Sequence, residues 1–186
     1  MSRLKHACRI NFGPFRGRTI EALVFDSEGY EFLYHFSKER GQEDCLASLR
    51  AFARRILAMA DEKPVVTRTC DCGNVPKFAK YFTGRATIFE SLHCEQCKPD
   101  SCELGQYYWL VPLVFSSQRL FRNPDERKRF VRFLTTWVGM SRPITANRAF
   151  AFFFPVEAAA QRQEREAQIP ECLRDRPPRP LGFSLC

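Results

Sequence analysis

The chain has 186 residues, of which 45% are hydrophobic, and it carries a formal net charge of +8 at pH 7. This length and composition allow a packed core in one domain or two small ones. The 18 Phe residues favour β-structure and packed aromatic clusters. No run approaches the ~20 apolar residues that a membrane span needs, and residues 1–10 lack the apolar stretch of a secretory signal.

The excess positive charge is carried mostly by arginine, whose planar guanidinium matches phosphate geometry and stacks on bases. It favours nucleic acid or an acidic protein as a partner. Nine cysteines in a chain without a recognisable export signal favour metal binding in a reducing compartment over a disulfide framework. We therefore expect a cytoplasmic protein.

The first elements are predicted from turn and cap residues. Residues 9–12 suggest a brief strand, followed by a glycine turn that carries Arg16 and Arg18. Thr19 is a suitable N-cap for a short helix, and residues 28–38 predict an aromatic-faced helix. The two turn arginines suit phosphate contact; alternatively, they are simply solvated.

Residues 11–23 (Asn-Phe-Gly-Pro-Phe-Arg-Gly-Arg-Thr-Ile-Glu-Ala-Leu) are followed by Gly-Tyr-Glu-Phe-Leu at 29–33. This arrangement, within residues 9–57, resembles the small C-terminal module of exodeoxyribonuclease X-like proteins. The resemblance implies a compact accessory domain of a DNA-handling protein. The metal-binding carboxylates of that exonuclease have no counterpart, because Asp26 and Glu28 are isolated.

A helix is predicted from Asp44 to about Met59. Its apolar residues recur at helical spacing and form one stripe: Leu46, Leu49, Phe52, Ala53, Ile56 and Leu57. Three arginines are predicted to lie largely off this stripe: Arg50, Arg54 and Arg55. Residues 61–64 break the pattern and suggest a domain boundary.

Two cysteine pairs, Cys70/Cys72 and Cys94/Cys97, flank a hairpin predicted over Pro76–Glu90. Closely spaced pairs supply two zinc ligands each, and a fully thiolate-ligated zinc has no open position for water. We therefore predict a structural Zn²⁺ held by these four cysteines. Two buried or disulfide-bonded pairs are the alternative, and two further residues could replace a ligand: His93 and Cys102.

The hairpin also carries three cations interleaved with aromatic residues: Lys77, Lys80 and Arg85. Such an alternation can place cations beside stacking surfaces for unpaired bases, unless the aromatic side chains pack inward. The apolar run Gln106–Phe115 predicts a strand buried on both faces, with Pro112 placing it at an edge or bulge.

Asn123 and Pro124 mark the start of a helix, with Phe130, Phe133, Leu134 and Trp137 predicted to face the core. Its other face holds four cations expected to meet phosphate or an acidic protein: Arg127, Lys128, Arg129 and Arg132. The remaining segments are a predicted strand with alternating Phe (142–155), a polar helix (157–168) and a Pro-rich tail.

Together these elements predict an α+β protein: a small N-terminal α/β module, then a zinc-ribbon-like hairpin packed on a few strands and helices. The expected divisions are an N-terminal module at 1–62, the zinc-hairpin domain at 63–168 and an extended tail at 169–186.

Five features follow one another from Cys70 to Pro155: Cys-x-Cys-Gly, a Phe-rich hairpin, Leu-His-Cys-Glu-Gln-Cys, Tyr-Trp-Leu-Val and Arg-Pro-Ile-Thr. This order is similar to that of the zinc-containing Cas8-like subunit of type IV CRISPR effector complexes. The resemblance implies a ribonucleoprotein subunit of antiviral defence that helps read a motif beside the DNA target. Lys77, Lys80 and Arg85 would then contact bases. The first knuckle departs from the family's usual Cys-x-x-Cys.

We found no convincing catalytic constellation. Of the three histidines, His93 adjoins a cysteine knuckle and His35 lies in the aromatic-faced helix, and no phosphate-binding glycine loop occurs. We therefore expect a non-catalytic, zinc-stabilised subunit that binds RNA or DNA within a larger complex. The alternative is a zinc-ribbon adaptor that binds a DNA-processing enzyme. A third hypothesis is a magnesium-dependent nuclease that uses Asp26 and Glu28.

Overall fold

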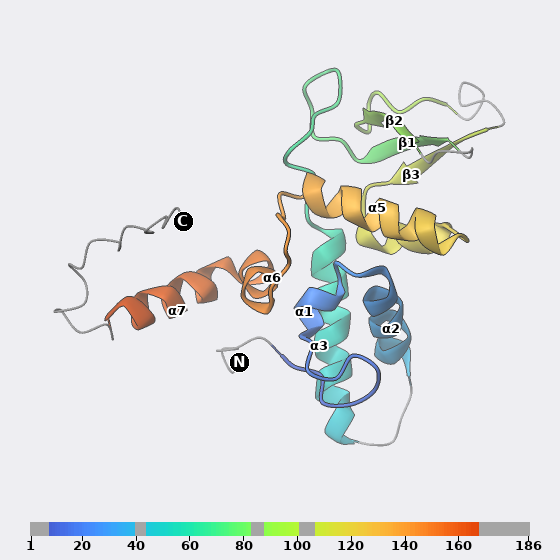
Figure 1. The fold of residues 1–186 in the computed structure, drawn as a ribbon. Helices are drawn as coiled ribbons and strands as arrows, with labels where there is room; N and C mark the ends of the chain where they lie inside the picture. Colours follow the sequence, from blue (N-terminus) through green and yellow to red (C-terminus); the bar gives the residue numbers. More distant parts are fainter. Residues whose placement is uncertain (1–7, 40–43, 83–87, 101–106, 168–186) are drawn as a thin grey trace, which may run out of the picture.

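The computed structural model describes residues 8–39, 44–82, 88–100 and 107–167. Figure 1 shows a small antiparallel sheet lying over helix α5, with a group of helices on the other side of α5. Among the described helices, none combines the length and apolarity needed to cross a bilayer. The predicted α+β class is confirmed.

The N-terminal turn folds back on itself before the first helices. The expected strand at 9–12 is reduced to one bridge between Arg9 and Thr19. Thr19 caps α1 (Ile20–Leu23) by accepting a hydrogen bond from the Ala22 amide, as predicted. The next helix, α2 (Ser27–Lys38), begins at Asp26, whose carboxylate accepts from the amides of Glu28 and Gly29.

Helix α3 (Asp44–Asp61) packs against α2 through the predicted apolar stripe. Ala53, Ile56 and Leu57 are buried, as expected. Arg50 is not off the stripe, because it is only 8% exposed and its guanidinium lies over the Phe36 ring. The long aliphatic stem of arginine allows this placement.

The sheet has the strand order β2-β1-β3, all antiparallel. Its strands are β1 (Phe78–Phe82), β2 (Ile88–His93) and β3 (Tyr108–Pro112). Pro112 therefore lies in an edge strand, as predicted. The expected burial of this strand on both faces is wrong, because Trp109 is 63% exposed. Only one face of the sheet packs on α5, where Phe89 contacts Phe130 and Trp137.

A 3₁₀ helix, η1 (Phe115–Leu120), leads into α5 (Pro124–Trp137). Asn123 caps α5 by accepting from the Asp125 amide, as predicted. Phe130 and Leu134 are fully buried, but Phe133 remains 41% exposed. It lies at the margin of the sheet, where it contacts Phe89 from the side.

The predicted strand at 142–155 is wrong: α6 (Ala146–Phe153) occupies this segment, capped by Thr145. The helix buries Ala149, Phe150 and Phe153 on one face, against α1 and α3. The polar helix predicted next is α7 (Pro155–Ala167), which extends away from the other helices in Figure 1. The proposed Pro-rich tail lies outside the described residues.

Buried side chains form a single apolar core that runs through both sides of the predicted 62/63 boundary. Phe25 from the end of α1, for example, packs against Phe115 of η1 and against Phe152 and Phe153 of α6. Residues far apart in the sequence thus fix the position of the α1–α2 junction relative to α5 and α6.

Candidate functional site

The structure brings together the four predicted metal ligands. The ligand atoms of Cys70, Cys72, Cys94 and Cys97 all lie within 4.8 Å of one another, and the sulfurs of Cys72 and Cys94 are 3.5 Å apart. Four sulfurs at ~2.3 Å from a central zinc would be about 3.8 Å apart. The cluster therefore has the dimensions of a tetrahedral thiolate site.

The hairpin register explains why the two cysteine pairs meet. Phe78 of β1 lies opposite His93 of β2, and the Lys77 amide donates to the His93 carbonyl. The first knuckle turns back at Gly73, whose φ of +84° favours glycine. Its amide donates to the Cys70 carbonyl at 2.8 Å, so the narrow Cys-x-Cys spacing still closes a turn.

Backbone amides favour the thiolate form of two of these cysteines. Burial raises the pKa of Cys94, but amides of Cys97 and Gln96 and the Cys72 thiol outweigh it and lower that pKa to about 6. The amides of Cys72 and Cys94 similarly lower the pKa of Cys70. Hydrogen bonds among the sulfurs raise the pKa of Cys97 to about 12. A divalent cation at the centre would stabilise thiolates at all four positions.

Of the two spare ligand candidates, His93 is described and is not part of this cluster. Both ring nitrogens of His93 are engaged elsewhere, one with the Ser91 hydroxyl at 2.7 Å and the other with the Cys97 carbonyl at 3.1 Å. Cys102 lies outside the described residues. The histidine orients the second knuckle from outside the sulfur cluster.

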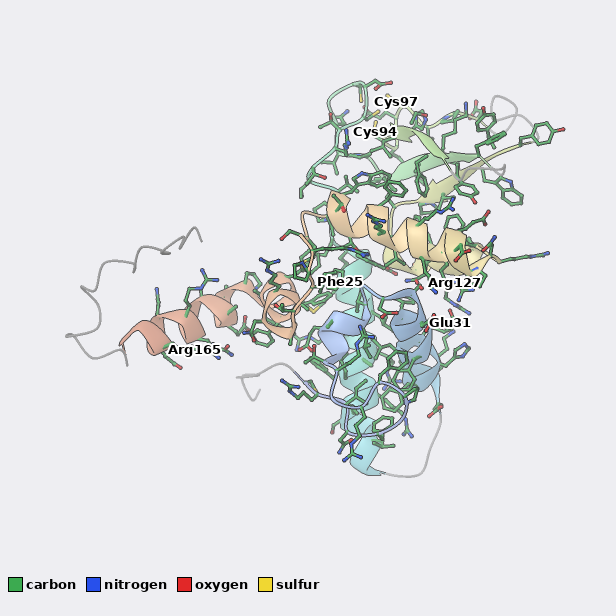
Figure 2. The ribbon with its side chains drawn as sticks, in the orientation of Figure 1. Phe25, Glu31, Cys94, Cys97, Arg127 and Arg165 are labelled. Atoms are coloured by element: carbon green, nitrogen blue, oxygen red, sulfur yellow. The ribbon has the colours of Figure 1, made fainter. Side chains whose placement is uncertain are left out.

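A second feature is an open cleft of about 800 Å³ between the α1–α2 junction, α5 and the loop before α6. Its charged lining comes from three separate stretches of the chain: Arg18, Asp26, Lys128, Arg129, Arg132 and Arg142. We call this the basic cleft. Figure 2 shows Phe25, which also lines it, on the opposite side of α5 from Cys94 and Cys97.

The cations of the basic cleft differ in whether they are paired. Arg18 forms an ion pair with Asp26 at 2.8 Å, and Lys128 lies 3.3 Å from Glu28. Burial of Asp26 opposes ionisation, but Arg18 and the Gly29 and Glu28 amides keep its pKa below the ordinary value. Three exposed guanidiniums have no ion pair among the described residues: Arg129, Arg132 and Arg142.

The other predicted nucleic-acid contacts are dispersed. Arg127 lies outside the cleft, facing α2, where it is 3.5 Å from Glu31 (Figure 2). Its guanidinium also donates to the Phe121 carbonyl. Arg16 is exposed on the N-terminal turn, outside the cleft. Lys77 is exposed just before β1, and Lys80 lies over the Tyr108 ring. Arg85 lies outside the described residues.

Sequence reasoning missed Arg142 because no periodic pattern includes it. It precedes Pro143 in the loop between α5 and α6, and only the packing of α6 on α1 brings that loop to the cleft. Of the two carboxylates of the nuclease hypothesis, Asp26 caps α2 and pairs with Arg18, and Glu28 lies in the first turn of α2 and pairs with Lys128.

Comparison of the chain with models of protein families, with curated proteins and with solved structures found no match.

Proposed function

We propose that this chain is a non-catalytic nucleic-acid-binding protein whose sheet is stabilised by Zn²⁺ at the four-cysteine cluster. The metal would hold the two knuckles at the base of the hairpin. Four thiolates leave no coordination position for a substrate or water, so the zinc has a structural role. Its distance from the basic cleft, across α5, fits that role.

The observation that carries the proposal is the gathering of Arg129, Arg132 and Arg142 in one cleft without carboxylate partners among the described residues. Like charges repel, so such a group is favourable when an anion lies between them. Guanidinium groups bind phosphate oxygens in a bidentate manner. A phosphodiester backbone supplies several phosphates along an open cleft of this kind.

The other two cations of the cleft, Arg18 and Lys128, are held in place by ion pairs. Their partners, Asp26 and Glu28, lie at the first turn of α2, where the carboxylates interact favourably with the positive helix end. These pairs hold the two cations at the rim. The net charge of +8 would speed association with a polyanion at low salt.

The test is a salt series with a fluorescently labelled oligonucleotide, measured by anisotropy. A variant with Arg129→Ala, Arg132→Ala and Arg142→Ala should bind much more weakly. The slope of log K against log salt should fall by about 2–3, since each phosphate contact contributes roughly 0.7–0.9. A matched control removes three exposed arginines outside the cleft: Arg54, Arg162 and Arg165.

Equal losses in the two variants would mean that only total charge matters, and the cleft would not be the site. If the unaltered protein binds no nucleic acid at low salt, the proposal fails. The zinc-ribbon adaptor would then be the better hypothesis. A role as a subunit of an RNA-guided complex is a more specific proposal than nucleic-acid binding alone. It predicts that a defined short RNA co-purifies with the chain.

A further inference from the structure

The basic cleft has an apolar floor as well as a charged rim. Four of its apolar lining residues are buried or half-buried, and we call them the cleft floor: Ala22, Phe25, Val131 and Ile144. Phe25 is 5% exposed and Val131 only 2%, whereas the arginines of the cleft are exposed. Side chains that line a cleft but are nearly buried form its deeper surface. The cations therefore surround an apolar surface that phosphate contacts alone would leave in water.

The floor is held in place by contacts within the protein. Phe25 packs against aromatic rings of η1 and α6. The loop that carries Ile144 is fixed by Arg148 of α6, whose guanidinium donates to the Pro143 carbonyl at 3.1 Å and whose amide donates to the Thr145 hydroxyl at 3.3 Å. A surface that is already ordered costs little to organise when a ligand binds.

A ligand that fills this cleft must carry anionic groups beside a flat or compact apolar group. A nucleotide unit of a nucleic acid has both, since its phosphate can reach the rim while its base covers the floor. In a duplex, only the edges of the bases are accessible, in the grooves. A base must leave the stack before its face can lie on a protein surface.

We propose that the cleft floor receives an unpaired base of a single-stranded nucleic acid, while the arginines of the rim hold the adjoining phosphates. This inference rests on the proposed function and adds the class of strand. Phosphate contacts alone favour a duplex, which carries about one charge per 1.7 Å, more than a single strand does. A preference for single strands must therefore come from the bases.

The first test uses the unaltered protein and three labelled DNA ligands of equal length, compared by anisotropy at one salt concentration. They are a single strand, its duplex, and the same strand with abasic residues in place of its central nucleotides. The single strand should bind more tightly than the duplex. The abasic strand keeps every phosphate but should bind about tenfold more weakly, because the contact of one base is lost.

The second test removes part of the floor and keeps the cations. Ile144→Ala should lower the affinity for the single strand about fivefold, the effect of losing one to two buried methylene groups. The slope of log K against log salt should not fall, since no phosphate contact is removed. Leu46→Ala is the matched control, because Leu46 is a partly buried apolar residue of α3 outside the cleft. It should bind the single strand like the unaltered protein.

The outcomes separate this inference from the proposed function. If the abasic strand binds as tightly as the normal strand and the duplex binds best, no base enters the floor. The proposed function would still stand if the variant without Arg129, Arg132 and Arg142 loses affinity. If the unaltered protein binds none of the three ligands at low salt, both inferences fail.

Discussion

The helical body (α1–α3 and α6) and the sheet unit (residues 65–114) keep their shapes by different means. The helices pack around side chains with no exposure, such as Ile20, Leu23, Leu33 and Ile56. The sheet unit has strands of five or six residues and buries one face on α5. A sheet of three short strands that packs one face on a helix only meets the usual minimum for stability. We infer from the difference that the apolar core is sufficient for the helices, whereas the sheet also depends on the cysteine cluster.

The largest expected effect comes from breaking that cluster. Cys70→Ser should lower zinc content and soluble yield, because binding energy at a structural zinc site is folding energy, about 10–16 kcal/mol in zinc-finger peptides. Hydrogen exchange should become fast in the sheet unit, while the helical body remains protected. Metal analysis by mass spectrometry, together with exchange measured by peptide, checks both expectations.

Cys8→Ser is the matched control, since Cys8 is a half-buried thiol outside the cluster. This variant should retain the zinc stoichiometry of the unaltered protein. The same zinc content in the Cys70→Ser variant would show that Cys70 is not a ligand. Equal loss of protection in the helical body would mean that the two parts unfold as one unit.

A smaller effect is expected where α1 meets α2. A Cβ at Gly29 would lie 2.9 Å from the carbonyl oxygen of Leu23 and 3.0 Å from its Cβ. Backbone cannot move aside cheaply, so Gly29→Ala should lower the free energy of unfolding by about 1–3 kcal/mol. Helix propensity alone predicts the opposite sign, by about 1 kcal/mol. Urea denaturation decides between the two.

Ser48→Ala, at an exposed position of α3, serves as the control. It changes helix propensity without a steric contact and should stabilise the protein slightly. Because Gly29 donates to Asp26, the partner of Arg18 in the basic cleft, Gly29→Ala should also weaken nucleic-acid binding. Zinc content should not change in this variant, and a loss of zinc would contradict the division between helical body and sheet unit.

The cysteine cluster was predictable because its signal is local. Each pair is closed within one turn, and the hairpin between Cys72 and Cys94 needs only antiparallel pairing to join them. The caps Thr19 and Asn123 were predictable for the same reason, since the side chain binds an amide two or three residues away.

Other features required tertiary contacts that no local pattern encodes. Phe150, Phe152 and Phe154 alternate like a strand, but Phe150 and Phe153 with Ala149 also fit one face of a helix, and packing on α1 and α3 favours the helix. The basic cleft joins three distant stretches of the chain. Net charge could predict that such a surface exists, but not that Arg142 would be part of it.

The smallest expected effect is a change in the pH dependence of stability, from a buried carboxyl in the helical body. Glu21 of α1 has no exposure, one of its oxygens accepts from the Cys8 amide at 3.3 Å, and the other has no partner among the described residues. Burial raises the pKa of Glu21 above its ordinary value of 4.5, against the lowering effect of amides of Glu21 and Cys8.

The folded state therefore holds the proton of Glu21 to higher pH than the unfolded state does, so this residue's contribution to stability is lost as pH rises through the folded pKa. Glu21→Gln cannot titrate, and its free energy of unfolding relative to the unaltered protein should rise with pH above 4.5, by at most about 1.4 kcal/mol per pH unit. Urea denaturation across this range measures the difference in free energy of unfolding between the two proteins. Zinc release at acid pH affects both proteins equally, so it cancels in this difference.

The matched control is Glu39→Gln, at an exposed position, which should follow the unaltered profile. Parallel profiles for Glu21→Gln and the unaltered protein would mean that the carboxyl has a partner or solvent access that keeps it ionised in the folded state.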